Sequence, residues 1–246
     1  MSHDDSSPDE LVVREKSVGF LSKRPTVTSE AGLETAIVHD LLDRGWLAGN
    51  SQDYDRGYCV DLAHLQAFVL ATQPRLAEAF DLSNDSPKRR QFLTRLEKEI
   101  ASRGVIDVFR KGIKHGAHDL TLFYATPSPD NAKAVALHAQ NGFSVTRQLC
   151  YSRDETRRAL DLGLFINGLP VATFELKNSL TKQTVADAIE QYKLDRDPKE
   201  PLFRFGRCVV HFAVDDAEVM MCTELRGKAS CLRRHLQGAP RRRWTS

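Results

Sequence analysis

The stretch Leu160-Asp-Leu-Gly-Leu-Phe-Ile-Asn-Gly-Leu-Pro-Val-Ala-Thr-Phe-Glu-Leu-Lys-Asn178 contains two apolar runs separated by a turn signal. The runs, residues 160–166 and 171–176, are rich in Leu, Ile, Val, Phe and Thr, and most of these residues favour strands. Between them, Asn167-Gly168 tolerates the positive φ angles that a tight hairpin turn requires. The sequence therefore predicts an antiparallel β-hairpin.

Three charged residues of this hairpin are expected to lie close together. Side chains alternate between the faces of a strand, so Glu175 and Lys177 point the same way, with Cα atoms about 7 Å apart. Folding the hairpin back about its turn places Asp161 opposite residue 175, to within one position. A surface Glu–Lys pair, together with an Asp that opens a strand, would give the same pattern.

Two carboxylates and an ammonium group on one sheet face are suited to metal-dependent hydrolysis. Carboxylates that lie close together repel each other unless a cation sits between them, and charges beside an apolar sheet need a partner or a metal. Mg²⁺ accepts a few carboxylate oxygens and keeps several waters. It polarises phosphoryl oxygens and acidifies water, and a lysine can offset the charge of the phosphate. The pattern therefore predicts either a hydrolytic metal site or an ordinary ion pair.

The same residues carry a resemblance to a known family. Asp161, thirteen intervening residues and Glu175-x-Lys177 resemble the core motif of the PD-(D/E)xK nucleases. The whole stretch 160–178 resembles the N-terminal nuclease domain of type I restriction enzyme R subunits. The resemblance covers about residues 20–227 and includes three more segments, residues 145–149, 191–203 and 209–214.

This resemblance implies both a fold and an activity. The implied fold is α/β, with a restriction-endonuclease-like core in which a mixed central sheet is flanked by helices. The implied activity is Mg²⁺-dependent hydrolysis of DNA phosphodiester bonds, with Asp161 and Glu175 as metal-binding carboxylates and Lys177 as the catalytic lysine. The implied partners are DNA and the methylation and specificity subunits of a type I restriction complex, in which a separate motor part uses ATP.

A helix expected over residues 30–44 supplies a further candidate ligand. Ser29 is a suitable N-cap, and apolar residues recur at helical spacing at Leu33, Ile37, Leu41 and Leu42. In the resembled family a glutamate of the first helix often completes the metal site. Glu34 is the better match and Glu30 the alternative. A first-turn carboxylate favoured by the helix dipole is the other interpretation of Glu34.

The helix expected over residues 183–194 departs from the family pattern. Many relatives carry Gln-x-x-x-Tyr there, as a DNA-contacting motif. In this sequence Tyr192 is present, but Ala occupies position 188 and the glutamine is the adjacent Gln191. Neighbouring residues do not share a helix face as an i, i+4 pair does. DNA contact by Gln191 and Tyr192 is therefore one interpretation, and packing of Tyr192 on the sheet is the other.

Residues 87–103 predict an amphipathic helix with a basic face. Its apolar positions are Phe92, Leu93, Leu96 and Ile100. Lys88, Arg89 and Arg95 are candidate contacts to DNA phosphates, which such residues bind with release of counterions. A solvated helix face would produce the same pattern. The other expected elements are helices over 60–72 and 131–141 and strands over 119–125, 144–150, 207–214 and 218–224.

Composition favours a cytoplasmic protein that does not enter a membrane. The 246 residues are 41% hydrophobic, but no apolar run approaches the roughly 20 residues that a membrane-spanning helix needs. Residues 1–19 begin with an acidic, polar segment, which is typical of a disordered tail and unlike a signal peptide. The five cysteines lack metal-site spacing, so we expect reduced cysteines that pack in the interior.

The C-terminal residues 228–246 are expected to form a basic tail. Residues 226–246 contain seven Lys or Arg and no Asp or Glu, so the rest of the chain carries a net negative charge. A Gly-x-x-x-x-Gly-Lys-Ser/Thr phosphate loop does not occur in the sequence, so ATP binding by this chain is unsupported. We therefore expect a nuclease domain that is truncated before, or separate from, the family's motor.

Two main functions are compatible with these observations. The first is a Mg²⁺-dependent DNA endonuclease domain of a type I restriction-modification system. The second is a catalytically idle module that binds DNA or docks into a complex, left after loss of the translocase. A stand-alone repair nuclease with the same core is a third interpretation, and the restriction-like stretch around the motif argues against it.

Overall fold

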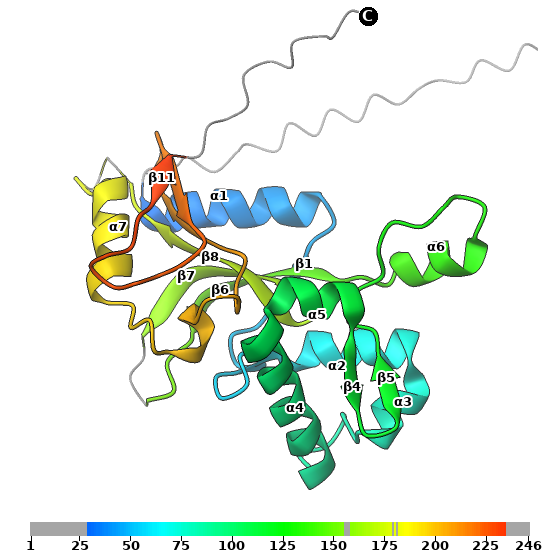
Figure 1. Ribbon diagram of the computed structural model, residues 1–246. Helices are drawn as coiled ribbons and strands as arrows, with labels where there is room; N and C mark the ends of the chain where they lie inside the picture. Colours follow the sequence, from blue (N-terminus) through cyan, green and yellow to red (C-terminus); the bar gives the residue numbers. More distant parts are fainter. Residues whose placement is uncertain (1–28, 155–157, 179, 181, 235–246) are drawn as a thin grey trace, which may run out of the picture.

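The computed structural model describes residues 29–154, 158–178, 180 and 182–234. Its centre is a seven-stranded sheet in the order β1-β6-β7-β8-β9-β10-β11 (Figure 1). The pairs β1–β6 and β8–β9 are parallel, and the other neighbours are antiparallel. This mixed sheet flanked by helices confirms the predicted fold class. The strands are β1 (Leu47–Ala48), β6 (Phe143–Cys150), β7 (Ala159–Ile166), β8 (Leu169–Leu176), β9 (Val210–Val214), β10 (Val219–Cys222) and β11 (Arg233–Arg234).

The predicted hairpin is formed by β7 and β8, joined by a two-residue turn. Asn167 and Gly168 have φ angles of 50° and 81°, the left-handed region that such turns require. The second strand begins at Leu169, two residues earlier than the sequence pattern indicates. Leu162 pairs with Phe174, so the next residues toward the open end of the hairpin are Asp161 and Glu175.

The turn of this hairpin is embedded in the protein. The Asn167 side chain is buried, donates to the carbonyl of Leu122 at 2.9 Å and accepts from the N–H of Gly142 at 2.7 Å. A Cβ atom at position 168 would lie 2.4 Å from the carbonyl oxygen of Asp61 and 2.5 Å from the nitrogen of Leu65. Only glycine therefore satisfies both the turn conformation and the close approach of the backbone.

Helices α1 (Glu30–Asp43) and α7 (Val185–Leu194) cover opposite faces of the sheet (Figure 1). On β9, Ala213 packs in the cluster that contains α7 and the adjacent Val214 packs in the cluster that contains α1. As predicted, α1 is capped by Ser29, whose hydroxyl oxygen accepts the N–H of Gly32 at 3.1 Å. The two helices thus enclose the open end of the hairpin from both sides.

Four helices, α2 to α5, form a second layer below the sheet in Figure 1, and they pack around their own apolar cluster. Buried Leu169 of β8 belongs to this cluster, so the layer supports the turn end of the hairpin. The elements are α2 (Leu62–Thr72), α3 (Pro74–Ala79), α4 (Pro87–Arg103) and α5 (Val105–Lys111), with the short strands β2 (Tyr54–Asp55), β3 (Val60–Asp61), β4 (Ile113–His115) and β5 (His118–Leu120).

Two predicted elements in this layer need correction. The helix expected over 60–72 begins at Leu62, because the Asp61 carboxylate accepts the N–H of His64 and acts as the N-cap. The strand expected over 119–125 extends only to Leu120. Beyond it, the amide side chain of Gln73 donates to the Thr121 carbonyl at 2.8 Å and accepts the Thr121 N–H at 2.9 Å. A side chain thus satisfies the backbone groups that a neighbouring strand would have bonded.

Three further elements agree with the sequence to within a few residues. Helix α6 (Ala132–His138) and strands β9 and β10 lie inside the predicted ranges. Part of the expected basic tail is ordered, since β11 pairs with Met220 and Met221. The expected N-terminal tail, residues 1–19, lies outside the described residues. All five cysteines are described and none forms a disulfide. None of the described helices is long and apolar enough to cross a membrane.

We predict that Gly168→Ala destabilises the protein much more than Gly116→Ala. Both glycines have positive φ, which costs a non-glycine residue about 1–2 kcal/mol. A Cβ atom has no neighbour within 4 Å at Gly116, whereas at Gly168 it meets backbone atoms and adds about 1–3 kcal/mol of overpacking. Urea unfolding of the two variants measures the difference. Equal losses would mean that the close approach at Gly168 is relaxed at little cost.

Candidate functional site

The hairpin brings the three predicted charges together at its open end. Asp161 Oδ2 accepts the backbone N–H of Leu176 at 2.7 Å, which ties the first strand to the end of the second. Glu175 is only 1% exposed. Lys177 directly follows β8, its N–H donates to the Val214 carbonyl, and its side chain is 11% exposed. Two carboxylates and one ammonium group therefore lie at a largely buried edge of the sheet.

Arg196 is the direct partner of Glu175. Its Nε donates to Glu175 Oε1 at 2.6 Å, and its side chain is only 6% exposed. The other carboxylate oxygen, Glu175 Oε2, is buried and has no hydrogen-bond partner among the described residues. The sequence pattern does not single out Arg196, because an arginine within Asp-Arg-Asp-Pro, just after α7, has the appearance of an ordinary polar loop residue.

Helix α1 brings Glu30 and Glu34 to the same edge. Glu30 Oε1 lies 3.5 Å from the Nζ of Lys177. Glu34 is buried, and both of its oxygens are engaged, Oε1 by Arg147 and Oε2 by Gln148 at 2.7 Å. Because each oxygen already has a partner, Glu34 would have to share its carboxylate with these two groups in order to bind a metal.

The β6 strand is distorted where it meets this site. Gln148 has a φ angle of 46°, unusual for a residue other than glycine. It lies between the paired positions Arg147–Leu162 and Leu149–Leu160, so it is the neighbour of Asp161 on the adjacent strand. Backbone strain of this kind is typical of functional sites, where the surrounding structure maintains it.

Burial raises the pKa values of both hairpin carboxyls, and neighbouring negative charges add to the effect. Removal from water raises the pKa of Asp161, and the charges of Glu30 and Glu34 add to this effect, while the Leu176 N–H and Lys177 oppose it. Removal from water raises the pKa of Glu175 to about 7, although Arg196 pulls it down. A cation placed between the two carboxylates would therefore stabilise their charged forms.

The donor set fits a hard divalent cation through two carboxylates. No group of three or more His, Cys, Asp or Glu side chains arranged to hold a metal is found in the described ranges. Mg²⁺, however, commonly uses one or two carboxylates and completes its shell with water and substrate phosphate. Glu175 Oε2 is free for this purpose, and Asp161 has no ion-pair partner within 4.0 Å among the described residues.

The residues that the sequence suggests for DNA contact on α7 are largely enclosed. Tyr192 is fully buried, and its hydroxyl lies 2.8 Å from Thr173 Oγ1, which in turn lies 2.7 Å from His211 Nδ1. This position matches the packing interpretation of Tyr192, which has no surface left to offer to DNA. Gln191 lies beside it, and its Oε1 is buried without a hydrogen-bond partner in the described part of the chain.

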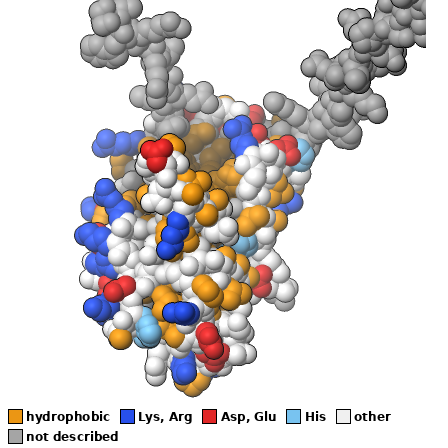
Figure 2. All heavy atoms as spheres, turned by 90° about the vertical axis from the view of Figure 1, so that its right-hand side faces the viewer, with side chains coloured by type: hydrophobic (Ala, Val, Ile, Leu, Met, Phe, Trp, Pro, Cys, Tyr) orange, Lys and Arg blue, Asp and Glu red, His pale blue; other side chains and the backbone are white. Residues whose placement is uncertain are grey.

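The basic residues of α4 lie in the other layer of the protein, and in the described part of the chain no ion pair joins them to Asp161, Glu175 or Lys177. The predicted helix is present, with its apolar face buried. Arg89 pairs with Asp85 at 3.0 Å and Arg95 with Glu99 at 2.6 Å, whereas Lys88 is exposed. Figure 2 shows several Lys and Arg side chains along the left edge of one face of the molecule, with apolar side chains mainly toward the middle of that face. The structure therefore does not join these residues and the carboxylates into one site.

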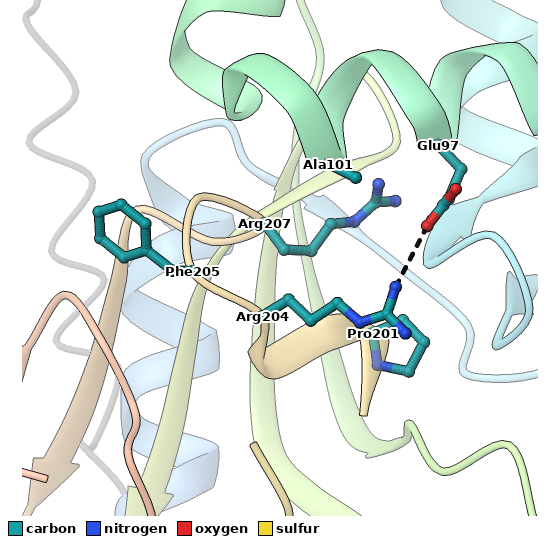
Figure 3. A pocket seen from close by; sticks show the side chains of 6 residues that line it. All are labelled: Glu97, Ala101, Pro201, Arg204, Phe205 and Arg207. Atoms are coloured by element: carbon teal, nitrogen blue, oxygen red, sulfur yellow. Dashed lines mark ion pairs between the residues drawn. The ribbon is translucent and has the colours of Figure 1, made fainter. Parts of the chain in front are cut away.

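Two of the cavities found among the described residues lie away from the carboxylates. A small one of about 50 Å³ lies between α4 and the loop after α7, where Arg204 pairs with Glu97 at 3.6 Å (Figure 3). An open groove of about 480 Å³ lies between α5 and the sheet and is lined almost entirely by apolar side chains. Neither contains Asp161, Glu175 or Lys177, so the candidate chemistry lies at the sheet edge between α1 and α7.

Comparison with known protein families identifies a match for most of the chain. The family model described as type I restriction enzyme R protein N terminus matches residues 28–230, which include the whole sheet up to β10 and both covering helices. The search of curated proteins returned no match.

We predict that burial of neutral His211 makes the protein lose stability in acid. Burial lowers the pKa of His211 from its ordinary 6.5 to about 4. As the pH falls from 6.5 toward 4, His211 therefore becomes protonated in the unfolded chain before it does so in the folded protein. This lowers the free energy of unfolding at pH 5 by about 2 kcal/mol relative to pH 7. Urea unfolding measures the drop in the free energy of unfolding between pH 7 and pH 5. This drop should be about 2 kcal/mol larger in the wild type than in His211→Asn.

The exposed His39 of α1 provides the control for this measurement. His39→Asn should retain the full wild-type difference between pH 7 and pH 5. If His211→Asn loses as much stability as the wild type between the two pH values, burial of His211 is not the source of the acid sensitivity.

Proposed function

The chain belongs to the family of type I restriction enzyme R protein N-terminal regions, and we propose that it is a Mg²⁺-dependent DNA endonuclease domain. It would hydrolyse DNA phosphodiester bonds within a type I restriction-modification complex, alongside methylation and specificity subunits. The single observation that carries this proposal is the cluster of Asp161, Glu175 and Lys177 at one buried edge of the sheet. Burial of charges is costly unless they are paired or bind an ion, and clusters of buried titratable groups are frequent at functional sites.

In this proposal each residue has a distinct role. Asp161 and Glu175 hold the metal, Glu175 through its free Oε2. When bound, the divalent cation supplies Lewis-acid polarisation of the phosphoryl oxygen and makes a bound water more acidic. Lys177 lies beside the carboxylates and offsets negative charge that develops on the phosphate. Glu30, 3.5 Å from the Lys177 ammonium, restricts where that ammonium can lie.

The second candidate is a module that binds DNA or docks into the complex without cutting. Two observations favour it: Arg196 already neutralises Glu175, and Arg147 and Gln148 occupy both oxygens of Glu34. A site in which protein cations satisfy the carboxylates has less need of a metal. The two candidates therefore differ in whether the purified chain binds a divalent cation.

We predict that the purified chain cuts DNA in the presence of Mg²⁺ or Mn²⁺ at high protein concentration. Asp161→Asn and Lys177→Ala should each lower the rate at least about 100-fold, because each removes a group that stabilises charge in the transition state. Conversion of supercoiled plasmid to nicked and linear forms measures the rate. Lys133→Ala, at an exposed lysine of α6, is the matched control and should cut at the wild-type rate.

Calorimetric titration with Mn²⁺ separates the two candidates even where cutting needs the rest of the complex. The nuclease proposal requires that the wild type binds Mn²⁺ and that Glu175→Ala does not. Cleavage that survives both Asp161→Asn and Lys177→Ala would refute this assignment of the site. A wild-type chain that neither binds Mn²⁺ nor cuts would favour the idle module.

A further inference from the structure

We infer that Arg196 is a positioning residue of the metal site, which fixes the Glu175 carboxylate so that Oε2 is the oxygen offered to the cation. This inference rests on the proposed function and deepens it. Arg196 lies in the loop after α7, 21 positions from Glu175 in the sequence, and its Nε donates to Glu175 Oε1 at 2.6 Å. Both side chains are buried, since Arg196 is 6% exposed and Glu175 is 1% exposed.

The guanidinium group is itself anchored, so it can impose an orientation on Glu175. Nη2 donates to the backbone carbonyl of Ala159 at 3.0 Å, at the start of β7. Nη1 donates to the hydroxyl of Tyr151 at 3.3 Å, and the guanidinium carbon lies 5.4 Å from the centre of the Tyr151 ring. A planar group held by bonds in three directions has little freedom to rotate. Glu175 therefore receives its hydrogen bond from a fixed direction.

The pattern of bonds leaves one carboxylate oxygen for another partner. An arginine that only neutralises a carboxylate commonly spans both oxygens with two parallel bonds. Here, a single bond from Nε reaches Oε1, while both terminal nitrogens are committed elsewhere. Glu175 Oε2 remains buried without a partner among the described residues. Leaving a buried oxygen without a partner is costly, and an ion or a water bound in the working protein would remove that cost.

A competing interpretation gives the opposite expectation. If Arg196 occupied the place of the metal as a rival cation, its removal would free Glu175 and tighten metal binding. If Arg196 positions Glu175, its removal frees the carboxylate to rotate and weakens metal binding. Side chains that orient metal ligands typically contribute 10–100-fold to metal affinity. The direction of the change therefore decides between the two.

Mn²⁺ titration of the full chain by calorimetry provides the test. Arg196→Gln should weaken Mn²⁺ binding about tenfold or more. Arg196→Lys keeps the positive charge but lacks the planar fork, so it should also bind more weakly than the wild type. Tyr151→Phe removes only the hydroxyl that supports Nη1, without stranding a buried charge, and should give a smaller loss of affinity in the same direction.

Arg207 supplies the matched control (Figure 3). It is as buried as Arg196 and donates to the backbone carbonyls of Tyr58 and Cys59, but it contacts none of the site residues. Arg207→Gln should lower the unfolding midpoint, as Arg196→Gln does, while Mn²⁺ affinity stays at the wild-type value. A general loss of stability would weaken binding in both variants alike.

The outcomes are distinguishable. If folded Arg196→Lys and Tyr151→Phe bind Mn²⁺ as tightly as the wild type or more tightly, the inference is overturned and the proposed function is unaffected. Binding tighter than that of the wild type would identify Arg196 as a rival cation. Equal weakening in the Arg207 variant also overturns it, because the effect then reflects stability alone. Failure of the wild type itself to bind Mn²⁺ overturns the proposed function and this inference together. Where Arg196→Gln does not fold, the Lys and Phe variants decide the question.

Discussion

The candidate site depends on the register of one hairpin, and that register is fixed at the end of the hairpin remote from the site. The turn at Asn167-Gly168 is held by buried hydrogen bonds of Asn167 and by the close approach of the backbone at Asp61 and Leu65. A shift of one residue would move every side chain of a strand to the other face. Because the turn cannot slip, Asp161 and Glu175 arrive next to each other at the open end.

The second constraint is the electrostatic cost of that convergence. Four carboxylates meet at the sheet edge, and three of them have cationic partners: Glu30 has Lys177, Glu34 has Arg147 and Glu175 has Arg196. A buried pair that loses one partner leaves an uncompensated charge, which is strongly destabilising. The partners in these ion pairs come from α1, β6, the loop after α7 and the end of the hairpin. The ion pairs therefore connect three separate parts of the fold at the open end of the hairpin.

The sequence predicts those features that depend on local patterns. Ser29 caps α1 because the cap needs only a hydroxyl at a helix start, and the hairpin follows from the alternation of residues about Asn167-Gly168. The convergence of Asp161, Glu175 and Lys177 also follows from local spacing, together with the resemblance to a nuclease motif. By contrast, the strand expected over 119–125 ends early because of a side chain 48 positions away, Gln73. Contacts at that separation leave no local pattern.

Arg196 and Glu34 illustrate the same limit within the site. The family pattern identifies Glu34 as a candidate ligand, but its oxygens are taken by Arg147 and Gln148, more than 100 positions away in the sequence. Arg196 contacts β8, the start of β7 and Tyr151 at once, so only the folded chain reveals it. Physical reasoning from the sequence therefore finds the charged groups of the site, and the structure decides which of them have partners.

The distribution of these partners points to one place for an added cation. Asp161 is the only one of the four carboxylates with no ion pair within 4.0 Å in the described ranges, and Glu175 Oε2 has no hydrogen bond there. Both carboxyls have raised pKa values, caused first by burial and then by neighbouring negative charge. One divalent cation shared by Asp161 and Glu175 Oε2 would relieve the repulsion between them and offset the cost of their burial. Glu30 and Glu34 are already compensated, so the same cation would gain less from either of them.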